Sequence, residues 1–114
     1  MKLLWKVRIT QHTLAMYIKV CLDSILSPET EAKKCMNALM QKFDEKPQST
    51  LVLFETLPLI LRLMLLLKND DETKRCVRIA LGNDASCHDF LLTLQELQLF
   101  MLDVVYDACH RVGD

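Results

Sequence analysis

The sequence predicts an all-α fold of four to five helices, and three features of its composition carry that prediction. Glycine occurs twice and proline three times in 114 residues, which leaves few residues for the tight reversals of a β domain. Leucine, a strong helix former, occurs 22 times. Hydrophobic residues make up 51% of the chain and charged residues 25%, a balance typical of one folded domain rather than a disordered segment.

Two helices are expected in the first half of the chain. Apolar residues recur every three or four positions over residues 7–26, which is the spacing of one buried helix face. Ser27 can cap the amides that begin a second helix, and Pro28 suits its first position, so we expect that helix over residues 28–44. Its apolar stripe is narrow, which predicts a helix lying on the surface of the core.

The middle of the chain contains a connector and a proline. The polar segment at residues 46–49 is the candidate hinge within a single domain that spans the chain, 1–114. Pro58 follows a short apolar turn, and the ring of a proline clashes with the helical turn before it. We therefore expect a break or kink near Thr56 and a new helix over residues 57–68.

A short helix with clear boundaries is expected next. Asp70 or Asp71 can cap a helix over residues 72–81, because a carboxylate oxygen accepts hydrogen bonds from the first free amides. Gly82 and Asn83 follow, and both residue types tolerate the left-handed conformation that ends many helices.

The final helix, residues 86–111, carries two apolar rows. The first row includes Leu94, Leu97 and Met101, and the sequence leaves open whether these three side chains form the core or contact a partner. The second row widens the apolar face, which predicts either the central helix of a bundle or a face that another chain covers. It consists of Leu91, Leu92, Leu99, Leu102 and Tyr106.

The charge balance bears on the class of partner. A net charge of -1 lacks the basic excess that a nucleic-acid-binding domain needs. Residues 1–50 carry eight basic and five acidic groups, a net charge of +3, whereas residues 51–114 carry six and ten, a net charge of -4. This asymmetry suits head-to-tail stacking of copies, and it is equally the pattern of two solvated surfaces.

The cysteines and the apolar segments predict a protein of the cytoplasm or nucleus. Five cysteines at irregular spacing, without a CxxC pair, argue for free thiols in a reducing compartment. Lys6 and Arg8 interrupt the apolar start, so we expect no secretory signal. The most apolar stretch, residues 51–67, contains Arg62, which favours a buried helix over a membrane span.

We expect neither a metal site nor a catalytic site. Two Cys-His pairs, at residues 87–88 and 109–110, offer zinc ligands, but on one helix they are 22 residues, or about 33 Å, apart. No glycine-rich turn accompanies a cysteine or serine nucleophile, and two glycines cannot build a phosphate-binding loop. The sequence therefore predicts no enzymatic activity, no cofactor and no small-molecule ligand.

Residues 57–83, LPLILRLMLLLKNDDETKRCVRIALGN, resemble one armadillo or HEAT-type helical repeat. Leu57-Pro58 would open the first helix of the repeat and Asp70-Asp71 would form its turn, while residues 51–54 resemble the extra short helix of the armadillo family. The resemblance implies a short array of stacked helices, or a fragment of a longer array, that presents a groove to a peptide or helix. A helical bundle and a short armadillo/HEAT-like array are thus the two architectures expected.

Further candidate partner-binding residues lie in two places. Lys74, Arg75 and Arg78 form a basic face, which is either solvated or receives an acidic or phosphorylated peptide. Trp5 belongs to an apolar cluster near the N-terminus, where an aromatic side chain either packs on its own core or anchors a partner.

Taken together, these patterns predict a protein–protein interaction module. An apolar helical face at residues 57–68 or 90–108 would dock a partner helix, an acidic peptide or a second copy of the chain. The alternative is a compact regulatory bundle, similar to a viral or host death regulator, that sequesters a partner helix. No nucleic acid and no membrane is expected among the partners.

Overall fold

The computed structural model describes residues 2–45 and 50–113, and the side chains within residues 6–45 and 52–111. These residues form five α-helices and no strand, which confirms the all-α prediction. The helices are α1 (Lys2–Ser24), α2 (Glu31–Glu45), α3 (Thr50–Asn69), α4 (Asp71–Leu81) and α5 (Asp84–Gly113).

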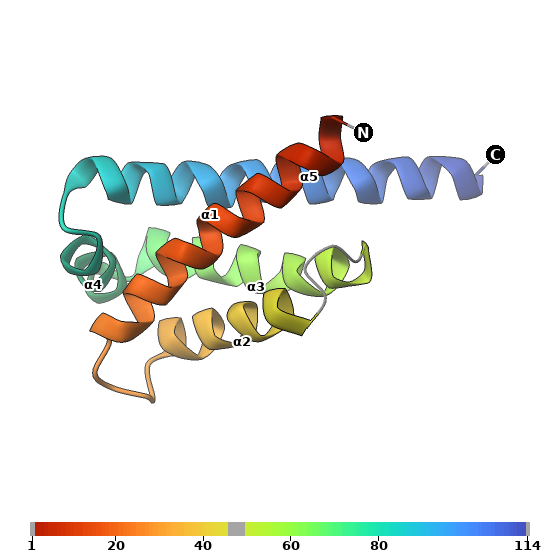
Figure 1. The fold of residues 1–114 in the computed structure, drawn as a ribbon. Helices are drawn as coiled ribbons and strands as arrows, with labels where there is room; N and C mark the ends of the chain where they lie inside the picture. Colours follow the sequence, from red (N-terminus) through yellow and green to blue (C-terminus); the bar gives the residue numbers. More distant parts are fainter. Residues whose placement is uncertain (1, 46–49, 114) are drawn as a thin grey trace.

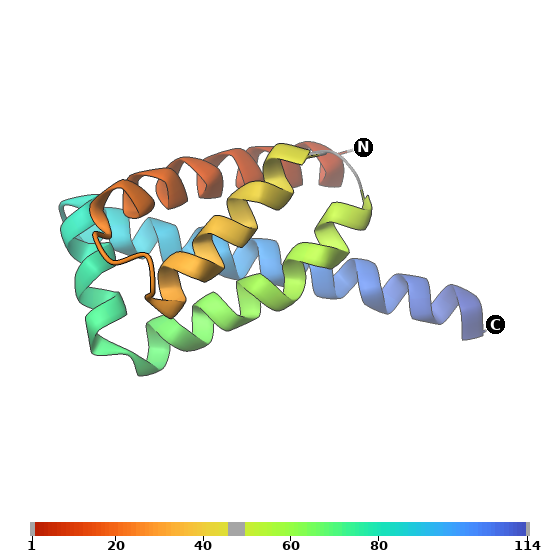
Figure 2. The ribbon, with the colours of Figure 1, turned by 90° about the horizontal axis from the view of Figure 1, so that it is seen from below.

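The five helices pack as a closed bundle. In Figure 1, α1 crosses α5 at an angle, α2 and α3 lie side by side, and α4 closes the end of the bundle where the chain turns from α3 into α5. Figure 2 shows the same packing from below. Helices α1 and α3 each contact α2, α4 and α5, so the first helix touches the last. In a stacked array each repeat touches only its neighbours, and the bundle is therefore the architecture that is observed.

The core lies where the apolar stripes of the helices converge. Phe90 is the largest fully buried side chain, and the ring of Tyr17 meets it edge to face, with centroids 5.8 Å apart and planes at 83°. Every helix contributes to the core, as the periodicity of the apolar residues predicts. Other side chains of the core are Leu14, Ile18, Met36, Leu39, Ile60, Leu63, Val77, Leu94, Leu97 and Met101.

The second helix begins three residues later than predicted. Thr30, not Ser27, caps α2, because the backbone N–H of Lys33 donates to the Thr30 hydroxyl oxygen at 3.3 Å. Ser27 and Pro28 lie in the connection before it, where the Lys33 ammonium group donates to the carbonyl of Ile25 at 2.7 Å. The connection is longer than expected because burial of Ile25 holds the chain against the core before α2 can start.

The predicted break near Thr56 is wrong, since α3 runs without interruption through Pro58. A proline inside a helix costs about 3 kcal/mol, because its ring clashes and a backbone hydrogen bond is lost. Leu53 before the proline and Ile60 and Leu63 after it are all buried, and each such side chain contributes about 1.5–3 kcal/mol. This burial on one continuous face outweighs the cost of Pro58, whose own ring is exposed.

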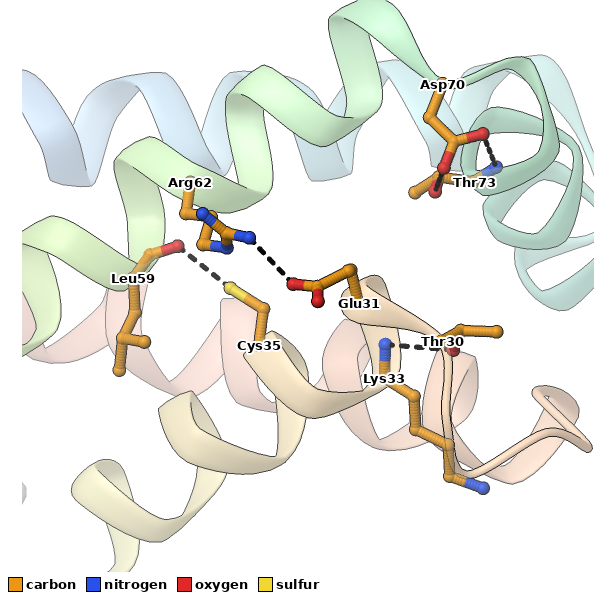
Figure 3. Close-up of polar contacts among 8 residues, drawn as sticks. All are labelled: Thr30, Glu31, Lys33, Cys35, Leu59, Arg62, Asp70 and Thr73. Atoms are coloured by element: carbon orange, nitrogen blue, oxygen red, sulfur yellow. Dashed lines mark hydrogen bonds and ion pairs between the residues drawn. The ribbon is translucent and has the colours of Figure 1, made fainter.

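Polar contacts join α2 to α3 (Figure 3). The guanidinium of Arg62 donates to the Glu31 carboxylate at 2.7 Å, and this hydrogen bond lowers the pKa of Glu31. One helical turn away, the Cys35 thiol donates to the carbonyl oxygen of Leu59 at 3.1 Å. Helix α2 thus packs on one side of α3. The groove described below lies on another side of α3, toward α5.

The boundaries of α4 confirm the sequence prediction. Asp70 accepts hydrogen bonds from the backbone N–H of Glu72 at 3.0 Å and of Thr73 at 3.3 Å. Gly82 ends the helix at a φ of 83°, in the left-handed region. Helix α5 begins at Asp84, two residues before the predicted Ser86, because the Asn83 side chain accepts the Ser86 N–H at 2.7 Å. The predicted hinge at residues 46–49 lies outside the described residues.

The cap of α4 should make stability depend on pH in the acid range. Hydrogen bonds from the Thr73 hydroxyl and from backbone amides lower the pKa of Asp70 below its ordinary value of 3.8. The capping contribution is therefore complete above the unfolded-state pKa and is lost as the pH falls through the lower folded-state pKa. Asp70→Asn keeps the acceptor oxygen and does not titrate, so it should lose less stability than the native protein between about pH 5 and pH 2. Urea unfolding at several pH values measures this, and equal losses would contradict it.

The leucine-rich stretch at residues 51–67 lies within α3 and turns Ile60, Leu63 and Leu67 into the bundle. Among the helices described, none has both the length and the apolar character needed to cross a membrane.

Candidate docking surface

A groove opens between α3 and α5 and extends onto α4. It consists of two adjoining hollows, one of about 420 Å³ and one of about 270 Å³, which share Leu67, Lys74 and Leu91. We call this surface the α3–α5 groove. Its apolar lining residues are Leu61, Met64, Leu65, Leu67, Val77, Cys87 and Leu91, and its polar lining residues are Lys68, Lys74, Arg78, Gln95 and Gln98.

Helical periodicity places these side chains along two facing edges. On α3, Leu61, Leu65 and Lys68 follow one another at steps of four and three, and so share one side of the helix. On α5, Leu91 directly follows the buried Phe90, so its side chain points about 100° away from the core direction. Because the apolar stripes of both helices are wider than the core needs, leucine side chains remain at the surface.

The groove is bordered by positive charge. Lys68 closes the end of α3, while Lys74 and Arg78 project from successive turns of α4, and no acidic residue lines either hollow. The Arg78 guanidinium is 3.6 Å from the Asp84 carboxylate, but both groups are largely exposed, so the pair is weak. Within residues 6–45 and 52–111, Lys68 and Lys74 form no ion pair.

Cys87 is the one thiol among these lining residues, and its environment does not activate it. The pKa of Cys87 is raised, mainly by partial burial of the thiol. Asp84 adds to this effect, and Arg78 opposes it. A thiol with a raised pKa stays protonated at neutral pH and is a poor nucleophile. Burial likewise raises the pKa of Cys21 to about 12, with Cys87 and Cys76 adding to the effect. The groove thus offers contacts for binding and no prepared nucleophile.

The two Cys-His pairs lie near opposite ends of α5, which is one continuous helix. Cys109 is exposed, and the Tyr106 hydroxyl and the His110 ring nitrogen are 3.1 Å apart. Within the described residues, no group of three or more histidine, cysteine and acidic side chains is placed to hold a metal ion.

Only some of the partner-binding residues that the sequence analysis proposed lie at the groove. Lys74 and Arg78 line the α3–α5 groove, whereas Arg75 is exposed and does not line it. The side chain of Trp5 lies outside the described residues.

The sequence left open whether Leu94, Leu97 and Met101 form the core or contact a partner. All three are buried in the core, so they are not available to a partner. They belong to the core cluster, and α5 packs against α1, α3 and α4. The row displayed at the surface is instead the second one, with Leu91, Leu92, Leu99, Leu102 and Tyr106. Leu65, Gln95 and Gln98 were not singled out from the sequence, although the leucine-rich helix to which Leu65 belongs was.

Comparisons of the chain with protein-family models, with curated proteins and with solved structures find no match. The comparisons therefore assign neither a family nor a repeat. The likeness to a helical repeat rests on the sequence of residues 51–83 alone, and the separate short helix expected over residues 51–54 is part of α3.

Proposed function

We propose that this protein is an interaction module whose α3–α5 groove docks an amphipathic helix of another protein or of a second copy. The observation that carries the proposal is an apolar groove on a closed bundle, bordered by three basic side chains and no acidic one. A helix with an apolar face and acidic flanks would match both properties of the groove.

The apolar lining supplies the affinity in this proposal. Leu65 is 59% exposed and Leu91 is 40% exposed, although both lie beside a well-packed core. Covering a leucine completely contributes about 1.5–3 kcal/mol, so two partly exposed leucines offer a partner a few kcal/mol. The basic side chains would select acidic partners and speed their encounter more than they would strengthen the final complex.

The closed packing favours a compact regulatory bundle over an extended repeat scaffold as the kind of interaction module. A repeat scaffold binds an extended peptide along a concave row of helices, whereas this bundle offers one short groove. A regulator that sequesters a single helix, the alternative similar to a death regulator, would bind one helix per chain. We place its action in the cytoplasm or nucleus, because all five cysteines are free.

Synthetic helical peptides test this proposal directly. One peptide carries leucines at i, i+3, i+4 and i+7 with glutamates on the flanks, and its matched control has the same leucines with lysines on the flanks. The native protein should bind the acidic peptide at least about tenfold more tightly by calorimetry, and the difference should shrink at high salt. The bound peptide should be helical, with one peptide per chain.

Two charge substitutions locate the binding. Leu65→Glu places a negative charge in the groove and should weaken binding of the acidic peptide about tenfold or more. Met16→Glu on α1 is the matched control, since Met16 is 58% exposed against 59% for Leu65, and it should bind as the native protein does. Equal affinity for both peptides, or equal loss from both variants, would contradict the proposal.

A further inference from the structure

The last turns of α5 extend beyond the rest of the molecule. Both views show this helix projecting past the ends of the other four (Figures 1 and 2). Its 30 residues correspond to about 45 Å, close to the full 48 Å length of the molecule. All side chains described from Tyr106 onward are exposed. We call residues 99–111 the α5 end.

The α5 end is itself an acidic amphipathic helix. Leu99, Leu102 and Tyr106 are exposed and follow at steps of three and four, so they form one apolar face. Asp103 and Asp107 flank that face one turn apart, and the first Lys or Arg is Arg111 at the tip. A contiguous row of exposed apolar side chains next to acidic residues is the pattern of a helix that can dock on an apolar, basic surface.

The charges of the α5 end and of the groove match in sign and in spacing. Lys74 and Arg78 are four residues apart on α4, as Asp103 and Asp107 are on α5. Side chains at this spacing lie about 5–6 Å apart on a helix surface, so two aligned helices would bring two opposite pairs together. Lys6 and Asp103 border a separate hollow of about 170 Å³ between α1 and α5, but they form no ion pair in the described residues.

We propose that the α5 end of one copy docks in the α3–α5 groove of a second copy. This inference rests on the proposed function and names the occupant of the same groove. A chain cannot fill its own groove, because Leu91 in the groove and Tyr106 in the α5 end are 15 residues, or about 22 Å, apart on one continuous helix. Each copy has one groove and one α5 end, so the contact joins two different surfaces and either closes a ring of copies or continues as an open chain.

Two variants of the full chain each disable one side of this contact. Asp103→Lys/Asp107→Lys reverses the charges of the α5 end, and Lys74→Glu/Arg78→Glu reverses those of the groove. All four side chains are exposed, so both variants should give the native circular dichroism spectrum. Asp89→Lys/Glu96→Lys is the control, because it makes the same change at two exposed acidic residues nearer the start of α5.

Light scattering across concentration measures the outcome. The native protein and the control should show a mass that rises above 13.2 kDa with concentration and falls with added salt. Each reversed variant should associate at least about tenfold more weakly than the native protein. It should therefore keep the mass of one chain at concentrations at which the native protein associates. A mixture of the two variants should associate as the native protein does, because the intact groove meets the intact end and the reversed end and reversed groove are again opposite in charge.

Other results would overturn the inference. A native protein that stays at one-chain mass up to about 1 mM has no such contact. Unchanged association of the variant with a reversed α5 end would assign self-association to another surface, such as the outer faces of two α5 helices. In both cases the binding of the synthetic acidic peptide still tests the proposed function separately, because that measurement does not require self-association.

Discussion

Leu97→Asp is expected to prevent folding. Leu97 is fully buried, with 0% of its surface exposed, in the core where α5 packs against α1, α3 and α4. Truncating a buried leucine costs about 2–5 kcal/mol, and burying an unpaired carboxylate adds several more. A small domain has about 5–15 kcal/mol of stability in total, so this single change removes most or all of it. Circular dichroism should show loss of helix and no cooperative thermal transition.

Leu99→Asp is the matched control for this prediction. Leu99 lies two residues further along the same helix and is 62% exposed. The same chemical change at this position leaves the carboxylate in water, so folding should be native and stability should change by less than about 1 kcal/mol. A folded Leu97→Asp protein with native stability would show that Leu97 is not buried, which would contradict the packing of α5 described above.

Phe90→Ala should lower the free energy of unfolding by about 3–5 kcal/mol. Phe90 is fully buried where α5 meets α1, and its ring makes the edge-to-face contact with Tyr17. Removing the ring takes away its burial and this aromatic contact, and it leaves a cavity that surrounding helices fill only in part. Urea unfolding followed by circular dichroism gives the difference, with the slope of the transition expected to stay unchanged.

Leu92→Ala serves as the comparison for Phe90→Ala. The Leu92 side chain, two residues away, is 41% exposed, so its truncation should cost less than about 1.5 kcal/mol. The ratio between the two losses tests which row of α5 supports the bundle. Equal losses would show that α5 is not anchored through Phe90.

Local chemistry made parts of the fold predictable from the sequence. Asp70 and Gly82 act within one turn of α4, through a side-chain cap and a left-handed residue. The sequence predicted Gly82 in its role and offered Asp70 or Asp71 as the cap. The final helix was predicted from its periodic apolar residues, and its boundaries differ from the observed ones by two residues at each end.

Other features depend on contacts between distant segments, which local patterns do not contain. Pro58 breaks an isolated helix, yet here the burial of residues on either side keeps α3 continuous. Similarly, Thr30 rather than Ser27 caps α2, because Ile25 is held in the core. In both cases tertiary packing, and not the local preference, decided the outcome.

The candidate site follows the same division. The basic residues Lys74 and Arg78 were recognised from the sequence, since they form a charged pair one turn apart on a single helix. The groove itself arises only when α3 and α5 pack together, so the roles of Leu65 and Gln95 could not be read from one segment. The two apolar rows of α5 could not be ranked either, because periodicity shows that two faces are apolar but not which one is covered.

The central claim, that the α3–α5 groove is the docking surface, has a most direct test in methyl NMR. The protein, labelled at leucine, isoleucine, valine and methionine methyl groups, is titrated with the acidic helical peptide. The proposal predicts the largest shift changes at Leu61, Leu65 and Leu91 in the groove. The rival surface is the exposed apolar row of α1, formed by Ile9, Met16 and Val20. Shift changes confined to that row, with the groove methyl groups unmoved, would contradict the claim.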